Sequence, residues 1–163
     1  MFAPRQQHQT DEYEMTEFRK FANRFNKSAN AATSTQSDID KLEKELNIQL
    51  PNDYKRFLLS IGNIWTPGIL DLVVDKELDL ADVQQFWTPD EIIDDKKNFW
   101  TKQVSTDIIP FATDCMGNIF SFLASDLKQK TETADIYFLY HDFDTVEKIS
   151  NSFTVWINNF NKI

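Results

Sequence analysis

Three side chains of the chain have the chemical types of a catalytic triad, namely Cys115, His141 and Asp142. A thiol becomes a nucleophile when an imidazole takes its proton and a carboxylate orients that imidazole. Nothing in the local sequence brings Cys115 within hydrogen-bonding reach of His141. We therefore expect an unreactive loop cysteine, a local structural hydrogen bond at His141 and no enzyme activity. A hydrolase that uses Cys115 stays as an alternative.

Metal and nucleotide sites are disfavoured by residue type and spacing. A structural zinc site needs three or four ligands at short spacing, whereas Cys115 is accompanied only by the distant His8 and His141. The acidic run "DLVVDKELDLAD", residues 71–82, invites a calcium interpretation, but Val73 and Lys76 occupy positions that require a ligand and a glycine. The three glycines of the chain form no phosphate-binding loop. No metal and no cofactor are expected.

Charge is concentrated in the larger part of the chain. The formal net charge is -9, and residues 31–163 carry 12 Lys and Arg against 22 Asp and Glu. Such a surface repels phosphate backbones and anionic lipid and attracts basic proteins. Direct binding to nucleic acid or to a membrane is therefore disfavoured, although acidity can also serve solubility alone.

Length and composition indicate one domain with its own core. The 163 residues are 41% hydrophobic and include 14 Phe, which we interpret first as packing material. The single cysteine allows no internal disulfide. The first 30 residues lack the apolar segment of a signal peptide, and no apolar run is long enough to cross a membrane. These features predict a soluble, cytoplasmic protein.

Residues 1–36 are predicted to be a helical arm followed by a linker, and residues 37–163 the main domain. In the arm, Phe18, Phe21, Ala22 and Phe25 recur at helical spacing, so they form an apolar stripe. The stretch 27–36 is small and polar, as in a linker. The stripe must pack either on the main domain or on a partner, and a second copy of the chain would give a homodimer.

The main domain begins with two predicted helices. Ser37 is the expected cap of a helix over 38–47. Pro51 suits the first turn of a second helix, whose stripe starts at Tyr54 and ends before Gly62. The aliphatic segment "GILDLVVD", residues 68–75, predicts a strand.

A helix, three strands and a final helix are predicted to follow. Thr88 and Glu91 form the pattern of a capping box, and Trp100 is placed on the buried side of the helix that starts there. Strands are predicted over 107–112, 118–123 and 135–140, the first two joined as a hairpin, and a helix over 150–161 with Trp156 in the core. The fold class is α+β: a mostly antiparallel sheet of about four to six strands flanked by helices at both chain ends, plus an extra N-terminal helix.

Four segments at plausible spacing resemble landmarks of the SUKH superfamily. They are "DIDKLEKELNIQLPNDYKRFLLSIGN", "DIIPFATDCMGNIFSFL", "DIYFLYHDFDT" and "ISNSFTVWINNF", which together span Ser37 to Phe160. The chain departs from the family pattern at Asn118, where Asp is common, and in "SIGNIWTPG", residues 60–68. The arm lies outside the resemblance.

The resemblance implies a protein that binds other proteins. The superfamily groups bacterial immunity proteins against toxins with fungal regulators of cell-wall synthesis. Our leading hypothesis is an immunity protein that covers the basic active cleft of a cognate toxin domain, for example a nuclease; the alternative is a non-catalytic scaffolding or regulatory module. Recognition surfaces lie mostly on loops, so the expected partner-binding residues come from loops and strand ends. They are Trp65, Asp71, Asp75, Asp79, Trp87, Asp114, Asp142 and Asp144.

Overall fold

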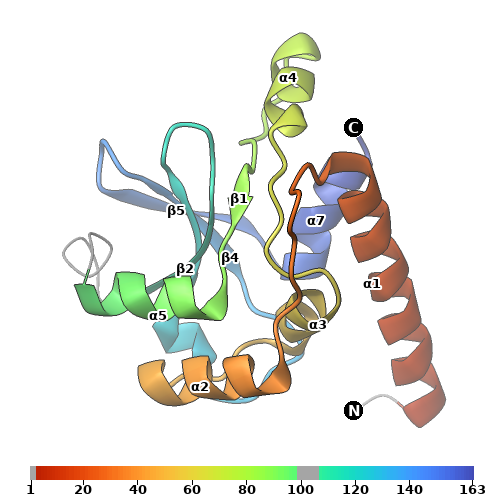
Figure 1. Cartoon of the computed structure of the whole chain (residues 1–163), viewed down its shortest axis with the longest axis vertical. Coiled ribbons are helices and arrows are strands. Elements are labelled where there is room, and N and C mark those ends of the chain that lie inside the picture. The colour runs from red at the N-terminus through yellow and green to blue at the C-terminus, as the bar shows by residue number, and fades with distance from the viewer. Residues whose placement is uncertain (1–2, 99–106) are drawn as a thin grey trace.

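The computed structural model describes residues 3–98 and 107–163 and confirms the α+β class (Figure 1). Within these ranges, no helix combines the length and the apolar character that a bilayer crossing requires. In chain order the elements are α1 (Pro4–Phe25), α2 (Gln36–Leu46), α3 (Asn52–Ser60), α4 (Gly68–Asp75), β1 (Gln85–Phe86), α5 (Pro89–Asn98), β2 (Ile108–Thr113), β3 (Ile119–Leu123), the 3-10 helix η1 (Ala124–Leu127), β4 (Ile136–Tyr140), β5 (Thr145–Ser150) and α7 (Phe153–Asn161).

The sheet is antiparallel throughout and follows the chain, in the order β1-β2-β3-β4-β5. The predicted hairpin between β2 and β3 is confirmed, with Ile108 opposite Leu123 and Thr113 opposite Ile119. A second hairpin joins β4 to β5, where Tyr140 lies opposite Thr145. Because the β2–β3 and β4–β5 connections are hairpins in an antiparallel sheet, their loops lie at the same end of that sheet, whereas β3 is joined to β4 through η1 at the other end.

The core lies between one face of the sheet and helices α3 and α7. Phe111 of β2 packs against Tyr54 of α3 and Phe153 of α7, with ring centroids 5.5 and 5.6 Å apart. Trp156 of α7 lies 4.9 Å from Phe120 of β3 and is buried, as predicted. Burying each such side chain contributes about 1.5–3 kcal/mol, so these phenylalanines are packing material as expected.

The apolar stripe of α1 packs on the rest of the same chain. Phe18 is 0% exposed and lies 5.4 Å from Phe57 of α3 and 5.9 Å from Phe153 of α7, measured between ring centroids. Figure 1 shows α1 running beside α7. The Arg24 guanidinium also donates to the main-chain oxygen of Ile163 at 2.8 Å. The stripe therefore belongs to the core of this chain.

The strand predicted over residues 68–75 is wrong, because this segment is helix α4. Its aliphatic residues suggested a strand, but they recur at helical spacing: Ile69 is buried, and Leu72 and Val73 are packed against the core. Asp71 and Asp75, four residues apart, are exposed. In Figure 1 α4 stands at the top of the view, apart from the layer of the sheet.

Helix starts follow the capping chemistry, with two corrections. The predicted capping box of α5 is confirmed, since Thr88 and Glu91 exchange two hydrogen bonds of 2.7 and 3.2 Å. The cap of α2 is Thr35 rather than Ser37: the Thr35 hydroxyl accepts a hydrogen bond from the Asp38 amide, and the Asp38 carboxylate accepts one from the Thr35 amide.

The last helix starts three residues later than predicted. Ser152 accepts a hydrogen bond from the Val155 amide at 3.1 Å, so α7 begins at Phe153. Ser150, the first residue of the predicted helix, belongs to β5 instead. The expected burial of Trp100 lies outside the described residues.

Candidate functional site

The loops of both hairpins and the segment after α4 meet at one end of the sheet. We call this surface the acidic sheet end and define it by Asp79, Asp82, Asp114, Asp142 and Asp144, together with the apolar Met116 and Phe143. Figure 1 shows the two hairpin loops at the same end of the sheet. The acidic sheet end is built by hydrogen bonds between segments that are far apart in the sequence.

Asp114 folds the loop between β2 and β3. Its Oδ1 accepts hydrogen bonds from the amides of Met116 and Asn118, both at 2.8 Å, and its Oδ2 accepts one from Asn118 Nδ2 at 2.8 Å. Gly117 in this loop has a φ of 85°, a conformation that side chains other than glycine rarely adopt. The carboxylate of Asp114 is thus used within the loop, and it holds Met116 at the tip.

Asn118 connects the two hairpins. While its amide nitrogen donates to Asp114, its Oδ1 accepts from the His141 amide at 3.1 Å and lies 2.9 Å from His141 Nδ1. An aspartate, the residue common at this position in the resembling family, has no donor for Asp114. The departure at Asn118 therefore suits the contact that this loop makes.

His141 makes local contacts with Asn118 and Asp142, in agreement with the structural hydrogen bond expected for it. Its Nε2 lies 3.0 Å from Asp142 Oδ1, a contact that becomes an ion pair when the imidazole is protonated. With Asn118 on Nδ1 and Asp142 on Nε2, both ring nitrogens are engaged. The orientation of His141 fixes where the β4–β5 loop starts.

Asp82 fastens the segment after α4 to the β2–β3 loop. Its buried carboxylate accepts a hydrogen bond from the Cys115 amide at 3.2 Å. Burial raises the pKa of Asp82, and the nearby charge of Asp114 raises it further. The sequence placed Asp82 in an acidic run, but only its long-range contact with Cys115 reveals its role.

The side chain of Cys115 is poorly suited to nucleophilic attack. Desolvation and the nearby Asp82 and Asp114 raise the pKa of the Cys115 thiol to about 11. A thiol with a raised pKa is protonated at neutral pH, whereas reactive cysteines have a lowered pKa. This environment therefore argues against the hydrolase alternative, which requires a reactive thiol at Cys115.

The structure gathers some of the predicted partner-binding residues and separates others. Asp79, Asp114, Asp142 and Asp144 lie at the acidic sheet end, whereas Asp71 and Asp75 lie on α4, which Figure 1 shows apart from the two hairpin loops. Trp65 is 44% exposed and forms a β-bridge with Gln85. Trp87 is only partly exposed because it packs on the core beside α5, away from the acidic sheet end.

Two exposed apolar side chains at the acidic sheet end were missed. Met116 is 68% exposed at the tip of the β2–β3 loop, and Phe143 is 78% exposed at the tip of the β4–β5 loop. Phe143 stands between Asp142 and Asp144 in "HDFDT", and an aromatic residue inside such a polar turn was the available signal. Large exposed apolar residues with a polar rim are typical of protein interfaces.

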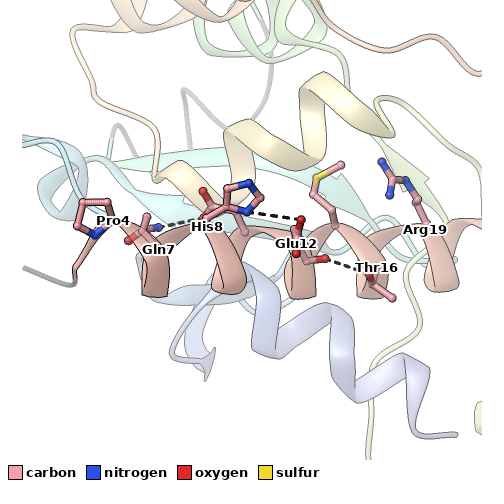
Figure 2. Close-up of a pocket in the computed structure, with 8 residues that line it drawn as sticks. Pro4, Gln7, His8, Glu12, Thr16 and Arg19 are labelled. Atoms are coloured by element: carbon pink, nitrogen blue, oxygen red, sulfur yellow. Dashed lines mark hydrogen bonds and ion pairs between the residues drawn. The ribbon is translucent and has the colours of Figure 1, made fainter.

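A shallow hollow of about 780 Å³ runs along one face of α1 (Figure 2). Its lining comes from this helix alone, and His8 Nδ1 lies 3.5 Å from Glu12 Oε1 one turn later. A catalytic or ligand-binding cavity normally has polar groups that converge from several elements. This hollow is therefore a less suitable candidate than the acidic sheet end.

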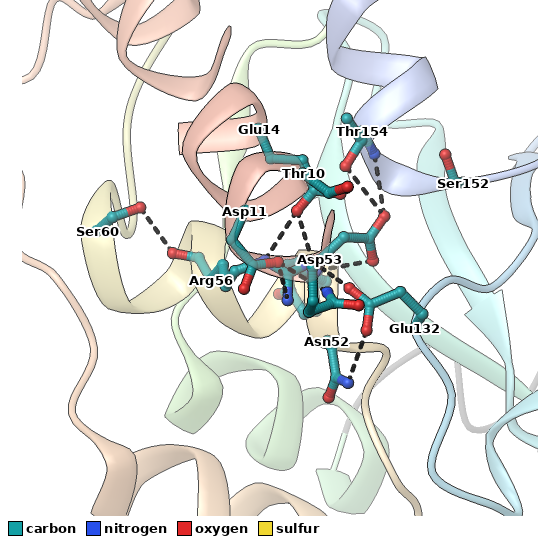
Figure 3. Close-up of polar contacts among 12 residues, drawn as sticks. Thr10, Asp11, Glu14, Asn52, Asp53, Arg56, Ser60, Glu132, Ser152 and Thr154 are labelled. Carbon is teal, nitrogen blue, oxygen red and sulfur yellow. Dashed lines mark hydrogen bonds and ion pairs between the residues drawn. The ribbon is translucent and has the colours of Figure 1, made fainter. Parts of the chain in front are cut away.

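A charged junction joins α1, α3 and the segment before β4 (Figure 3). Asp11, Glu14 and Glu132 offer carboxylate oxygens within 4.8 Å of one another, which could suit a metal ion. The Arg56 guanidinium already contacts all three: 3.5 Å to Asp11, 2.5 Å to Glu14, and a short ion pair with Glu132. The junction is an internal ion-pair network that fixes α1 to α3.

Comparison with known proteins agrees with this architecture. A model of the SMI1 / KNR4 family (SUKH-1) matches residues 33–159. The match starts after α1 and includes both hairpins of the acidic sheet end. The division into an arm and a main domain stays a prediction. No curated protein sequence matches the chain. Since the family model covers most of its length, the chain belongs to the SMI1 / KNR4 family (SUKH-1).

Proposed function

We propose that the protein is an immunity protein, which binds a cognate bacterial toxin domain and blocks its active cleft without turnover. Membership of the SUKH-1 family supports the choice of class. The observation that carries the proposal is the placement of Phe143, 78% exposed between Asp142 and Asp144 at the acidic sheet end. The protein would act in the cytoplasm of the cell that makes it.

The acidic sheet end has the two properties that such inhibition needs. Exposed anchors such as Phe143 and Met116 can enter pockets on a partner and supply most of the binding energy. The surrounding carboxylates raise the rate of encounter with a basic surface. A toxin that acts on nucleic acid needs a basic cleft, so a protein seated over that cleft excludes the substrate. The same charge disfavours direct binding of this protein to nucleic acid or to membranes.

Co-expression with the product of the neighbouring gene tests the proposal. We expect that product to be toxic when expressed alone, and we expect growth to be restored when this protein is co-expressed. Calorimetry on the purified pair should give a stoichiometry of one to one. Toxicity that persists, together with no measurable binding, would refute the proposal.

The alternative is a scaffolding or regulatory module, and the same experiment separates the two. A regulatory module would bind a partner that has no toxicity of its own, and its removal would change the partner's localisation or activity. A toxic partner whose activity in a purified assay falls to zero at equimolar protein supports the immunity function.

A further inference from the structure

Strand β5 forms an open edge of the sheet next to the acidic sheet end. It is the last strand in the order β1-β2-β3-β4-β5 and pairs only with β4. Residues 145–148 are all exposed, and Val146 keeps 40% of its surface accessible. The strand begins two residues after Phe143, so this edge continues from the loop tip that carries the proposed anchor. An edge strand offers main-chain donors and acceptors to another strand.

The direction of the main-chain groups in the sheet follows from the β2–β3 hairpin. The Asp114 amide donates to the main-chain oxygen of Asn118 at 3.1 Å, so these residues form a hydrogen-bonded pair. Successive pairs of an antiparallel ladder alternate between hydrogen-bonded and non-hydrogen-bonded. The next pair, Thr113 and Ile119, is therefore of the non-hydrogen-bonded kind. In agreement, the main-chain oxygen of Thr113 accepts from the Gln84 amide at 2.8 Å, on the side of β1.

The same alternation extends across the sheet to β5. The main-chain groups of Ile119 face its partner Leu139 in β4, so those of Leu139 face back toward β3. The pair of Leu139 and Val146 is consequently non-hydrogen-bonded, and the N–H and C=O of Val146 point away from β4. Lys148, two residues further along β5, has the same orientation.

The outward main-chain groups of Val146 and Lys148 are unpaired. Among residues 3–98 and 107–163, no hydrogen bond reaches the N–H or C=O of either residue on this side. A register shift between Ile136 and Tyr137 interrupts the ladder beyond Lys148. Residues 145–148 are therefore the part of β5 that can pair with another strand.

The side chains of β5 argue against a second copy of the chain at this edge. Because side chains alternate between faces, a two-fold axis between two antiparallel β5 strands must place one residue opposite its own copy. Centring on Glu147 or on Lys148 brings like charges together, which destabilises a strand pair. Centring on Thr145 or on Val146 reaches Asp144 within two residues, and its φ of 52° departs from the extended conformation.

We propose that an extended segment of the toxin partner adds to β5 as an antiparallel sixth strand. The inference rests on the proposed function, since it names how the partner's main chain is held beside the acidic sheet end. Pairing with Val146 and Lys148 supplies main-chain hydrogen bonds, and the facing side chains supply specificity. The partner's residue opposite Glu147 is basic, the one opposite Val146 is apolar and β-branched, and the one opposite Lys148 is acidic.

Hydrogen exchange on the wild-type protein, alone and with the toxin, tests this inference. In the free protein the amides of Val146 and Lys148 should exchange rapidly, whereas the amide of Glu147, which faces β4, should be protected. In the complex we expect exchange at Val146 and Lys148 to slow at least tenfold. Unchanged exchange in a complex that neutralises the toxin would overturn the edge pairing and leave the immunity function standing. Protection in the free protein that grows with its concentration would also overturn it, since a second copy would then occupy the edge.

A proline at position 148 tests the outward amide directly. Proline is tolerated on edge strands where the missing N–H faces solvent. Lys148→Ala is the matched comparison, because both variants lose the 2.9 Å ion pair with Asp135. We expect Lys148→Pro to bind the toxin at least tenfold more weakly than Lys148→Ala, and equal affinities would contradict the inference. If Lys148→Pro does not fold, the hydrogen exchange of the wild type decides.

A probe peptide tests the edge when the neighbouring gene product is neither bound nor neutralised, a result that refutes the immunity function alone. The free strand of this hairpin peptide reads Thr-Glu-Arg-Val-Thr, which places its glutamate opposite Lys148 and its arginine opposite Glu147. The control peptide, Thr-Arg-Glu-Val-Thr, places like charges opposite one another. We expect saturable shifts of the Val146 and Lys148 amide resonances of the ¹⁵N-labelled protein with the first peptide only. No shift with the first peptide, or equal shifts with both, would overturn the edge pairing.

Discussion

Asp53 at the start of α3 accepts hydrogen bonds from both the amide and the hydroxyl of Thr154 at the start of α7, at 3.1 and 3.3 Å. The two residues are 101 positions apart. Asp53 is 0% exposed, and its other carboxylate oxygen accepts from the Tyr54 amide at 2.8 Å. One buried carboxylate therefore joins the N-terminal ends of two core helices, next to the charged junction in Figure 3.

The buried position of Asp53 predicts a specific pH dependence of stability. Desolvation raises the pKa of Asp53 from 3.8 to about 6, the nearby Glu14 raises it too, and the hydrogen bonds from Thr154 and Tyr54 oppose the rise. The folded protein thus binds this proton more tightly than the unfolded chain, so its contribution to stability falls as the pH rises from about 4 to 6. Relative to Asp53→Asn, the wild type should gain on the order of 2 kcal/mol of unfolding free energy between pH 7 and pH 4. Urea denaturation of both proteins across this range measures it.

Asp38→Asn serves as the control of opposite sign. The hydrogen bonds from Thr35 lower the pKa of Asp38, so its contribution is present above about pH 4 and is lost as the pH falls through the folded value. The difference between wild type and Asp38→Asn should therefore shrink on acidification. A pH-independent difference between wild type and Asp53→Asn would show that burial does not perturb Asp53.

Replacing Arg56 should loosen the attachment of α1. Arg56→Met leaves the carboxylates of Glu14 and Glu132 together without their cation, and Glu14 is nearly buried. Breaking a fully buried ion pair costs about 3–5 kcal/mol, and Arg56 keeps 20% of its side chain exposed, so we expect a loss on the order of 2 kcal/mol. Lys41→Met breaks the exposed pair with Asp90 and should leave the unfolding free energy nearly unchanged. Equal losses in the two variants, measured by thermal unfolding, would contradict the assigned role of the junction.

Phe18 tests whether α1 is part of the folding unit. Phe18→Ala removes a fully buried ring from contact with Phe57 and Phe153 and should lower the unfolding free energy by about 3–5 kcal/mol. Tyr13→Ala, on the exposed side of the same helix, should change it by less than about 0.5 kcal/mol. A homodimer through the arm would have to use the outward face of α1, because the apolar stripe is occupied. Sedimentation equilibrium on wild type and Tyr13→Ala tests that association. A Phe18→Ala variant as stable as the wild type would show that α1 is not needed for the core.

Helix stripes and caps were readable from the sequence because their determinants are local. The spacing of Phe18, Phe21 and Phe25 and the Thr88–Glu91 box act within one or two turns. The apolar strands β2, β3 and β4 were readable too, whereas the two strands β1 and β5, which are defined by pairing rather than by composition, were not. The two residues of β1 form a strand through their register with Thr113 and Ala112. The polar, largely exposed β5 is an edge strand that pairs only with β4.

The candidate site divides in the same way. The acidic residues of the loops were visible in the sequence, since their types alone mark them as exposed. The contact between Asn118 and His141, which joins two hairpins, depends on the folded sheet. Segment 68–75 was wrongly predicted to be a strand although its helical spacing was visible in the sequence. Its aliphatic composition was given more weight than the spacing of Ile69, Leu72 and Val73.

Gly62 is predicted to be irreplaceable for a steric reason. It has a φ of 82°, and a Cβ placed on it would lie 2.0 Å from the main-chain oxygen of Ala32, where the linker crosses. Gly62→Ala should lower the unfolding free energy by about 3 kcal/mol, from left-handed strain and from displacement of the linker. In contrast, a Cβ on Gly68 meets nothing within 4 Å, so Gly68→Ala should be neutral or stabilising by about 0.5 kcal/mol. Chemical denaturation of both variants makes the comparison, and a Gly62→Ala protein as stable as Gly68→Ala would contradict the predicted clash.

The anchor and the charges of the acidic sheet end should affect different rate constants of toxin binding. Phe143→Ala removes an exposed ring that would be buried in the complex, so we expect faster dissociation, by tenfold or more, with little change in association. The double variant Asp142→Asn, Asp144→Asn should instead slow association and weaken its dependence on salt, because these carboxylates act at a distance.

Surface plasmon resonance at two salt concentrations resolves both effects, with Tyr13→Ala as the exposed aromatic control on α1. All of these side chains are exposed, so melting temperatures should stay near that of the wild type. A Phe143→Ala protein that dissociates at the wild-type rate would move the docking surface away from the hairpin tips.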